Sequence, residues 1–538
     1  MLDDIRYGSA KFADSREIAR AGLHVRRDGL FVGFDERGRG IYSGGQSAVL
    51  LVGGARSGKG NFIIPFLTDG AYRDTIIQLD PKGQNGAIAE LQISQGRRVT
   101  AFSPRGEVTN RINPLSHLTD ASPTLVPDTK LFVLNWLPFN GAENAEYFIA
   151  TGQRMIEGVT LALVELHGDI TLPELAEAMA VFGSDDDLAL ALEDAMAKSR
   201  HGIARQVALE LEARRKSDTP NAGGFTGAMG EVAKSFACLS DPQLRNAVSP
   251  PFDFSFAELT AEGAPPYLVS IQEAMEFMQS SASVIRALFT CALIYKRRTL
   301  GSRPQLWLLD EVGNIGSWPL AVELATFGAG FGIRPVYVVQ STAQLDNLAK
   351  NAGAIIPNSC GTQVYLGVRD PNEAQRLSRM LGTATIGVED FANNERARIA
   401  RKAAIRSVVM EGADPFEAAA QMAAQKQMAV HEAKLARPLM RPEEILAMPG
   451  DGVLVFMPGT LEHPIAARFA PYWKRRDLAG RYLPDPFHGD GKYVSLRTFW
   501  GLRTGAVIEE TPPPELEHLP QYGAGRSFRY IEGYKPEF

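Results

Sequence analysis

The chain has 538 residues, too many for one ordinary hydrophobic core, and its length indicates roughly two to four domains. Hydrophobic residues make up 45% and charged residues 22%, with a formal net charge of −6, which excludes a fibrous, a wholly disordered and a uniformly basic DNA-coating protein. Any nucleic-acid contact must therefore be local, and the dispersed cysteines (Cys238, Cys291 and Cys360) indicate neither a disulfide scaffold nor a zinc site.

Membrane and secretion signals are absent from the sequence as given. No apolar run reaches the ~18 residues that a membrane-spanning helix needs, and the first residues do not have the pattern of a signal peptide. We therefore expect a soluble chain in a reducing, cytoplasmic setting. Residues 1–47 are polar and glycine-rich, and they predict a helix over 14–21 and a hairpin over 29–42, together a small β lead-in.

A glycine-rich loop follows the first strongly apolar strand, at 48–52. Strand, loop and helix-compatible segment in that order are typical of a phosphate-binding loop, in which backbone N–H groups and the helix N-terminus surround an anion. Lys59 is predicted to reach the β- and γ-phosphates of a nucleotide. The residues predicted to form this cradle are Gly53, Gly54, Ala55, Arg56, Ser57, Gly58, Lys59 and Gly60.

One position departs from the usual pattern of this loop. Gly60 stands where a serine or threonine normally follows the lysine and binds Mg²⁺ through its hydroxyl group. A glycine-rich turn with a surface lysine is the alternative interpretation of the loop taken alone. The preceding strand and a pair of carboxylates further along the chain favour a phosphate-binding loop, and they leave the ligation of magnesium open.

Strands and helices around this loop predict a parallel sheet. Residues 48–119 form the first part of a nucleotide-binding domain, with strands over 75–79 and 98–102 and a closing piece at 111–115. Asp80 ends the first of these strands, so a parallel sheet places its carboxylate at the edge that carries the nucleotide. A simple Asp-Pro turn is the alternative for this residue.

The pattern of the sequence changes at residue 120. Long segments with helical spacing replace the glycine-punctuated strands, and they predict an all-α domain over 120–255 inserted in the α/β domain. The expected helices cover 144–166, 172–182, 185–199, 203–215 and 230–239.

The α/β pattern resumes over 256–487, the second part of the nucleotide-binding domain. An apolar strand at 305–309 runs into Asp310 and Glu311, and we expect Asp310 to hold Mg²⁺ through water and Glu311 to polarise the attacking water. The next strand ends at Gln340, a candidate sensor of the γ-phosphate, for which a strand-end N-cap is the alternative.

Two further segments are interpreted from their composition. Residues 395–434 are rich in Ala, Arg, Gln and Met, and they predict a helical excursion that is exposed or faces a partner. Residues 488–538 contain glycines and three consecutive prolines, and they predict a loosely packed C-terminal tail.

The order of these motifs resembles the type IV secretion coupling proteins, the TraG/VirD-type family of conjugative DNA-transfer ATPases. The resemblance covers most of residues 7–475, and the order of the motifs is specific although several are common singly. A lysine-glycine end to the phosphate loop is frequent in that family, so Gly60 supports the resemblance. The motifs are Tyr7-Gly8-Ser9-Ala10, the loop A-R-S-G-K-G with Pro65, Asp80-Pro81-Lys82-Gly83, Phe102-Ser103-Pro104, Asn113-Pro114-Leu115, Leu308-Leu309-Asp310-Glu311, Gln340-Ser341, Arg441-Pro442-Glu443-Glu444-Ile445 and Pro464-Ile465.

The resemblance implies an α/β fold, a RecA-like P-loop nucleotide-binding domain with an inserted all-α domain, that binds ATP and Mg²⁺. It also implies a DNA-stimulated ATPase, a ring-shaped hexamer with nucleotide between subunits, at the cytoplasmic face of the bacterial inner membrane. Its implied partners are single-stranded or duplex DNA, a relaxase or effector protein substrate, and the secretion channel. Family members usually begin with two transmembrane helices, which this sequence lacks, so we expect the isolated chain to be a monomer.

Two departures and two alternatives remain. In some family members, an arginine just before the strand that ends in the glutamine reaches into the neighbouring subunit. Here Gly328-Ala329-Gly330 occupies that area and only Arg334 lies near, so no arginine finger is assigned. Gln84 stands where an acidic residue often follows the Asp-Pro-Lys-Gly motif. The alternatives are a nucleotide-gated receptor that docks substrate proteins with little hydrolysis, and a related RecA-like DNA translocase of chromosome segregation or pilus assembly.

Overall fold

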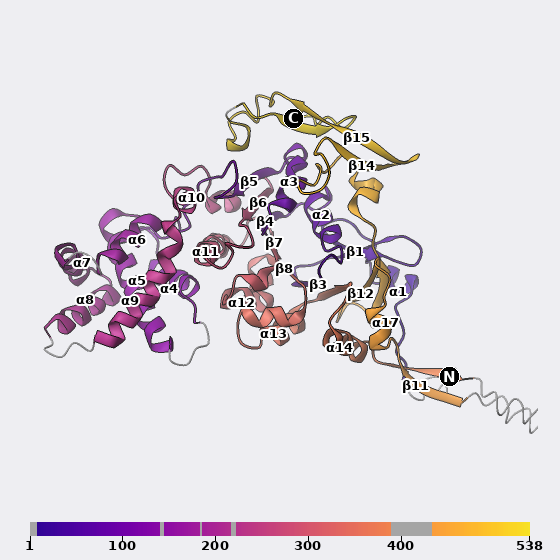
Figure 1. The fold of residues 1–538 in the computed structure, drawn as a ribbon, viewed down its shortest axis with the longest axis horizontal. Helices are drawn as coiled ribbons and strands as arrows, with labels where there is room; N and C mark the ends of the chain where they lie inside the picture. The colour runs from indigo at the N-terminus through magenta and orange to yellow at the C-terminus, as the bar shows by residue number, and fades with distance from the viewer. Residues whose placement is uncertain (1–7, 140–144, 183–185, 217–221, 389–432, 524) are drawn as a thin grey trace, which may run out of the picture.

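The computed structural model describes residues 8–139, 145–182, 186–216, 222–388, 433–523 and 525–538 (Figure 1). An 11-stranded sheet lies at its centre, in the order β2-β1-β13-β12-β9-β3-β8-β7-β4-β6-β5. The strands from β9 to β5 are parallel, and the four at the other end pair antiparallel. Their bounds are β1 Leu30–Phe34, β2 Gly40–Ser43, β3 Val49–Gly53, β4 Thr75–Asp80, β5 Arg98–Phe102, β6 Tyr267–Gln272, β7 Gln305–Asp310, β8 Ile333–Val339, β9 Thr362–Leu366, β12 Gly452–Phe456 and β13 Ile465–Arg468.

Helices cover both faces of the parallel strands, which explains their nearly continuous apolar sequences. Strand β3 is buried along its whole length, and its side chains alternate between the two faces. Leu50 and Val52 belong to the core beneath α11 and α12, whereas Val49 and Leu51 belong to the core beneath α2 and α3. The covering helices are α2 Gly60–Thr68, α3 Gln84–Ile88, α11 Ala282–Arg298, α12 Pro319–Phe327, α13 Ala352–Ser359 and α14 Pro371–Leu381.

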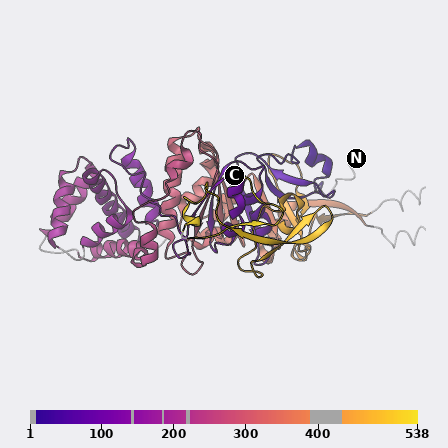
Figure 2. The same cartoon turned by 90° about the horizontal axis from the view of Figure 1, so that it is seen from above.

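A helical unit is inserted between β5 and β6 and lies at one end of the molecule (Figures 1 and 2). Two of the helices, α4 and α10, were not predicted from the sequence. Two predictions for this region were wrong: α9 begins well before residue 230, and residues 111–115 add no strand to the sheet, because Ile112 makes only an isolated bridge with Phe254. The helices are α4 Leu125–Trp136, α5 Glu146–His167, α6 Leu172–Val181, α7 Asp186–Lys198, α8 Gly202–Arg215, α9 Ala222–Phe236 and α10 Pro242–Ala247.

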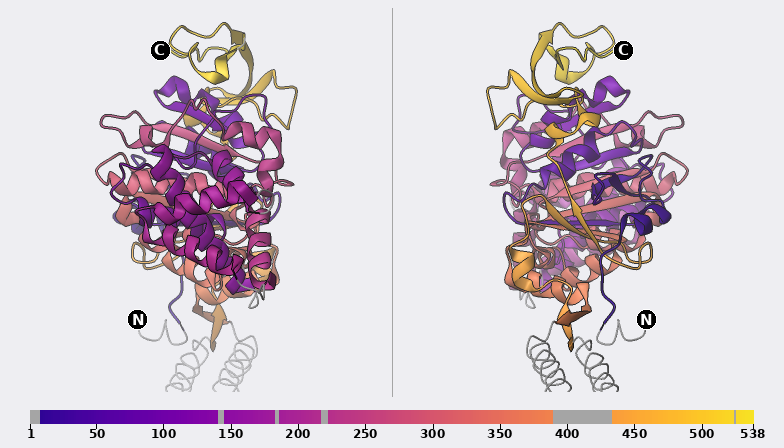
Figure 3. Two further views of the ribbon diagram at one scale, coloured as in Figure 1. Left: turned by 90° about the vertical axis from the view of Figure 1, so that its left-hand side faces the viewer. Right: turned by 90° about the vertical axis from the view of Figure 1, so that its right-hand side faces the viewer.

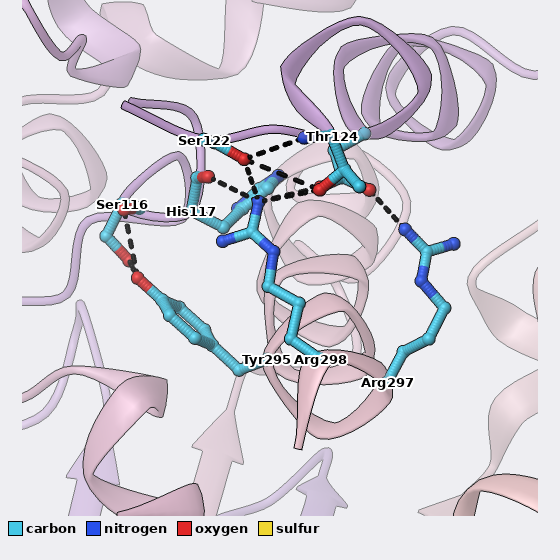
Figure 4. A network of polar contacts seen from close by, with 8 residues as sticks. Ser116, His117, Ser122, Thr124, Tyr295, Arg297 and Arg298 are labelled. Carbon is cyan, nitrogen blue, oxygen red and sulfur yellow. Dashed lines mark hydrogen bonds and ion pairs between the residues drawn. The ribbon is translucent and has the colours of Figure 1, made fainter. Parts of the chain in front are cut away.

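A buried polar network joins this helical unit to the sheet domain (Figure 4). Asp128 on α4 is completely buried and accepts hydrogen bonds from Thr124 Oγ1 at 2.6 Å and Arg298 Nη2 at 2.7 Å. Arg297, the preceding residue of α11, pairs with the other oxygen of the same carboxylate. Arg298 also donates to the carbonyl oxygen of His117 at 3.0 Å. The end of α11 therefore fixes the start of α4 through one shared carboxylate.

The N-terminal Gly8-Ser9-Ala10 segment pairs with a two-stranded ribbon, β10 Thr383–Val388 and β11 Ala433–Pro438. The N–H of Ala10 donates to Thr383 and the N–H of Thr385 donates to Gly8, both at 3.1 Å. Gly8 has φ +146°, and a Cβ there would collide with the carbonyl oxygen of Thr383. Tyr7 and the helix expected over 395–434 lie outside the described residues, except that 433 and 434 belong to β11 rather than to a helix.

The C-terminal segment is a folded three-stranded sheet, so the predicted loose tail is wrong. Its strands are β14 Tyr493–Thr498, β15 Gly501–Glu510 and β16 Phe528–Ile531. Leu496 and Ile531 are fully buried in the same core as α2 and α3. Arg529 pairs with Glu90 at 2.7 Å, which joins this sheet to the main domain.

Figure 3 places this C-terminal sheet and the β10–β11 ribbon at opposite ends of the molecule. Among the described residues, no helix combines the length and the apolar character needed to cross a membrane.

Candidate functional site

The predicted phosphate loop connects the carboxyl end of β3 to the first turn of α2 and is closely packed. A Cβ at Gly53 would lie 2.5 Å from Ser57 Oγ, and one at Gly54 would lie 2.8 Å from the carbonyl oxygen of Gly367. Arg56 and Gly58 both have positive φ, +58° and +94°. The backbone therefore makes a tight turn, and side chains at Gly53 or Gly54 would prevent it. A loop that presents its N–H groups to an anion needs such a turn.

Lys59 directly contacts Glu311, the second residue of the predicted Asp310-Glu311 pair. Its Nζ donates to Glu311 Oε1 at 2.7 Å, and both side chains are largely shielded, with 13% and 15% exposed. Glu311 follows β7 with φ +51°, a left-handed conformation that is costly for a residue with a side chain. This backbone turns the chain away from the strand at the point where the carboxylate meets Lys59.

Gln340, from the end of the intervening strand β8, completes the group. Its Nε2 lies 3.3 Å from Glu311 Oε2 and 3.4 Å from Oε1. Its own backbone N–H donates to Gln344 Oε1 at 2.8 Å, which holds the residue at the strand end. The structure thus brings Lys59 and Gln340 into contact with the same carboxylate, that of Glu311, at the carboxyl edge of the sheet, although the three residues are widely separated in sequence.

Asp310 and Asp80 lie side by side just behind this group. Asp80 is buried and accepts a hydrogen bond from the N–H of Gly86 at 2.8 Å, and burial raises the pKa of its carboxyl group to about 6. Burial, with the charges of Glu311 and Asp80, raises the pKa of Asp310 to about 7. Crowding of carboxylates at one point is unfavourable without a cation and is the donor set that Mg²⁺ prefers, so these residues fit a magnesium ion.

A side chain that sequence reasoning missed also reaches this cluster. Asn85 Nδ2 donates to Asp310 Oδ2 at 3.3 Å, from the first turn of α3. The preceding residue, Gln84, donates to Asp485 instead, so adjacent residues of α3 connect the carboxylate cluster to the segment before the C-terminal sheet. The signal in the sequence was the position of Asn85 at a strand's carboxyl edge, five residues after Asp80.

The missing hydroxyl of the phosphate loop has a partial counterpart. Gly60 begins α2 and offers no side-chain oxygen. Ser57 carries the loop's own hydroxyl group, and its Oγ is buried without a hydrogen-bond partner among the described residues. An unsatisfied buried hydroxyl is costly, and a bound ligand would relieve that cost.

Arg334 does not approach the site. It lies at the amino end of β8, is 1% exposed, and donates to the carbonyl oxygens of Ser43, Gly44 and Ser47. Burial lowers the pKa of its guanidinium group. The guanidinium stabilises the turn between β2 and β3 and is not available to a neighbouring subunit.

Comparison with known proteins places these features in context. The family model for type IV secretory system conjugative DNA transfer matches residues 7–412. The chain is 23% identical to the protein VirD4 of Agrobacterium fabrum, over 96% of this chain and 74% of that protein. It is 26% identical to a conjugal transfer protein TraG of Escherichia coli, over 82% of this chain and 71% of that protein.

Solved structures of the bacterial conjugative coupling protein TrwB have a similar fold. The unbound form aligns with a TM-score of 0.62 at 14% identity, and the complex with the ATP analogue ADPNP with a TM-score of 0.61 at 15% identity. Each alignment covers 86% of this chain and 93% of the other. The predicted fold class, an α/β RecA-like P-loop domain with an inserted all-α domain, is confirmed.

Proposed function

This chain belongs to the type IV secretory family of conjugative DNA-transfer proteins, and from that premise we propose that it is a coupling ATPase that recruits a transfer substrate and drives its movement by ATP hydrolysis. The observation that carries the proposal is the contact between Lys59 Nζ and Glu311 Oε1 at 2.7 Å, with Gln340 beside it. Solved complexes of TrwB with ADPNP and with ADP and Mg²⁺ support nucleotide binding at the equivalent fold.

Each side chain of the group has a distinct role in this proposal. The backbone from Gly53 to Gly60 binds the phosphates, and Lys59 leaves Glu311 to contact the β- and γ-phosphates. Glu311 is then free to accept a proton from the attacking water, and Gln340, already 3.3 Å from that carboxylate, contacts the γ-phosphate.

The second pair of acidic residues supports a magnesium ion. Asp310, oriented by Asn85, would hold the ion, with Asp80 behind it. When bound, magnesium would neutralise negative charge on the phosphates as the bond to the γ-phosphate breaks.

The proposal also includes the transfer substrate, the assembly and the location that the family resemblance implies. The substrate is a relaxase–DNA complex or an effector protein, and DNA stimulates hydrolysis. The working assembly is a homo-hexamer at the cytoplasmic face of the inner membrane, in contact with the secretion channel. The isolated chain without DNA is a monomer, and sedimentation of the free protein as a hexamer would contradict this part.

The test is ATP hydrolysis by the wild type and by Lys59→Ala, with and without single-stranded DNA, at low salt. Turnover that rises with DNA and is lost in the variant is expected. Nucleotide binding that depends on Lys59 without measurable turnover, in protein shown to assemble, would replace the motor with a nucleotide-gated docking receptor. One observation favours that second function: Gly60 lacks the hydroxyl that commonly ligates magnesium.

A further inference from the structure

The hairpin of β14 and β15 carries the most exposed large hydrophobic side chains among the described residues. Trp500 is 92% and Phe499 75% exposed, and their rings meet edge to face with centroids 5.2 Å apart. The hairpin projects from the C-terminal sheet in Figure 1. It lies beyond residue 412, where the match to the family model ends, so the family assigns it no role.

One face of the hairpin extends this exposed surface along the strands. In β14, Val494 and Leu496 point into the core, whereas Tyr493, Ser495 and Arg497 are exposed on the opposite face. Cross-strand pairing sets Leu502 opposite Arg497 and Thr504 opposite Ser495, and both partners are exposed. We call this surface the hairpin face: Tyr493, Ser495, Arg497, Leu502 and Thr504, with Phe499 and Trp500 at the turn.

The charge around the hairpin face is opposite to that of the chain as a whole. From residue 492 to residue 508 the sequence has Lys492, Arg497 and Arg503 and no acidic residue, in a protein of net charge −6. Arg476 adds a guanidinium 5.9 Å from the ring centre of Phe499. Within the described part of the chain, Arg497 and Arg503 form no ion pair with an acidic side chain. Arg497 is therefore free to meet an anionic partner on the hairpin face, whereas Arg503, opposite the buried Leu496, lies on the other face of the hairpin.

We propose that the hairpin face binds single-stranded DNA, with bases stacked on Tyr493, Phe499 and Trp500 and with phosphates facing Arg476 and Arg497. Exposed aromatic rings on a sheet, interleaved with arginines, are the arrangement that holds unpaired bases without sequence preference. The choice of DNA among polyanions rests on the proposed function. The hairpin would receive the strand outside the nucleotide site.

The arrangement fits a nucleic-acid strand better than a bilayer. A membrane wedge would use only Phe499 and Trp500, the two rings at the turn. Here Tyr493 lies at the far end of β14 from the turn, and the hydroxyl groups of Ser495 and Thr504 lie between. Insertion deep enough to bury Tyr493 would remove these hydroxyls from water at a cost, whereas a bound strand can accept hydrogen bonds from them.

The experiment measures binding of a fluorescein-labelled dT20 oligonucleotide to the full chain by fluorescence anisotropy, at low salt and without nucleotide. The double variant Phe499→Ala/Trp500→Ala is expected to bind at least about tenfold more weakly, since each stacked base contributes substantially. Trp500→Phe keeps a stacking ring and should stay close to the wild type. Arg497→Ala should bind more weakly and show a shallower dependence on salt.

Matched controls lie on other surfaces. Tyr147→Ala removes an aromatic side chain that is 57% exposed on the helical unit, and Arg37→Ala removes an exposed cation near β2; neither should change the affinity. Thermal unfolding of each variant checks that the C-terminal sheet is intact.

Two results would overturn the proposal. Affinity of the aromatic double variant within twofold of the wild type would show that the hairpin does not hold the strand. Loss of binding to phosphatidylglycerol vesicles in that variant, with oligonucleotide affinity unchanged, would assign the face to a bilayer. Because no nucleotide is present, Lys59→Ala should bind dT20 like the wild type, which separates this test from that of ATP hydrolysis.

Discussion

Glu311 Oε1 lies 2.7 Å from Lys59 Nζ, so the carboxylate expected to activate water also holds the lysine expected to bind phosphate. The two groups satisfy each other in this state, and an entering phosphate must compete with Glu311 for the lysine. We therefore expect binding of nucleotide and release of the carboxylate to be one event.

Glu311→Gln separates the role of Glu311 as the partner of Lys59 from its role as the acceptor of the proton of water. The variant should bind ADP about two- to fivefold more tightly, because a shielded ion pair no longer competes for Lys59. It should hydrolyse ATP at least about 100-fold more slowly, because the amide cannot accept a proton. Calorimetric titration with ADP and an assay of phosphate release measure the two effects. Glu323→Gln, on the exposed side of α12, is the control, and weaker ADP binding by Glu311→Gln would contradict the competition.

Asp128→Asn tests the junction between the helical unit and the sheet domain. Removing the charge leaves Arg297 and Arg298 without their shared buried partner, and we expect a loss on the order of 3 kcal/mol in unfolding free energy. The unfolding of the helices in urea, followed by circular dichroism, measures it. Asp194→Asn breaks only an exposed pair with Lys198 and should cost less than about 0.5 kcal/mol. Equal effects of the two substitutions would contradict a structural role for the network.

His117 makes the same junction sensitive to acid. Burial, and then the charges of Arg298 and Arg297, lower the pKa of its imidazole to about 3. The unfolded chain therefore binds one more proton than the folded chain between about pH 6.5 and pH 3. The contribution of the neutral His117 to stability is complete above that window and is lost as the pH falls through it. We expect this loss of stability to reach about 2 kcal/mol at pH 5.

His117→Asn removes this titration. The difference in unfolding midpoint between pH 7 and pH 5 should be smaller in the variant than in the wild type. His488→Asn, at an exposed histidine, should leave the difference unchanged. A wild-type pH dependence that survives His117→Asn would assign the acid sensitivity to other groups.

Leu496→Ala tests whether the C-terminal sheet is part of the core. The side chain is fully buried, and its truncation should destabilise the sheet by about 2–5 kcal/mol. Hydrogen exchange of β14 to β16 should become faster, while exchange in β3 stays unchanged. Leu502→Ala, at a residue 52% exposed, is the control. Fast exchange of these strands already in the wild type would restore the loose tail predicted from the sequence.

Much of the sheet was predictable because its parallel strands are apolar on both faces. The strand 98–102 has the bounds of β5, and the carboxylates predicted after 305–309 lie where β7 ends. Asp310 and Glu311 could be placed at the carboxyl edge because parallel strands share that edge. The contact of Lys59 with Glu311 was not predicted, because it depends on strand order and on the left-handed backbone of Glu311.

Other elements depend on partners far away in the sequence. In α4, Pro127 lies in the first turn, where a helix tolerates it, but no helix was predicted over these residues. In the C-terminal segment, the three consecutive prolines led to the prediction of a loose tail. The alternating apolar residues Val494 and Leu496 form only a short pattern, and they are buried by the main domain. Asn85 was missed because its position after Asp80 indicates only a place at the carboxyl edge, and its contact with Asp310, 225 residues away, depends on the order of the strands.

The edge of the main sheet has a consequence for how the chain is made. β5 is the last strand at one edge of the sheet. The carbonyl oxygen of Val99 in this strand accepts a hydrogen bond from Gln521 Nε2 at 3.1 Å. Asn110 forms hydrogen bonds with both the N–H and the carbonyl oxygen of Ala101. Asn110 leaves the ribosome soon after the strand, but Gln521 follows more than 400 residues later. Throughout most of synthesis, half of this edge is open to pairing with other nascent chains, and the final residues close it.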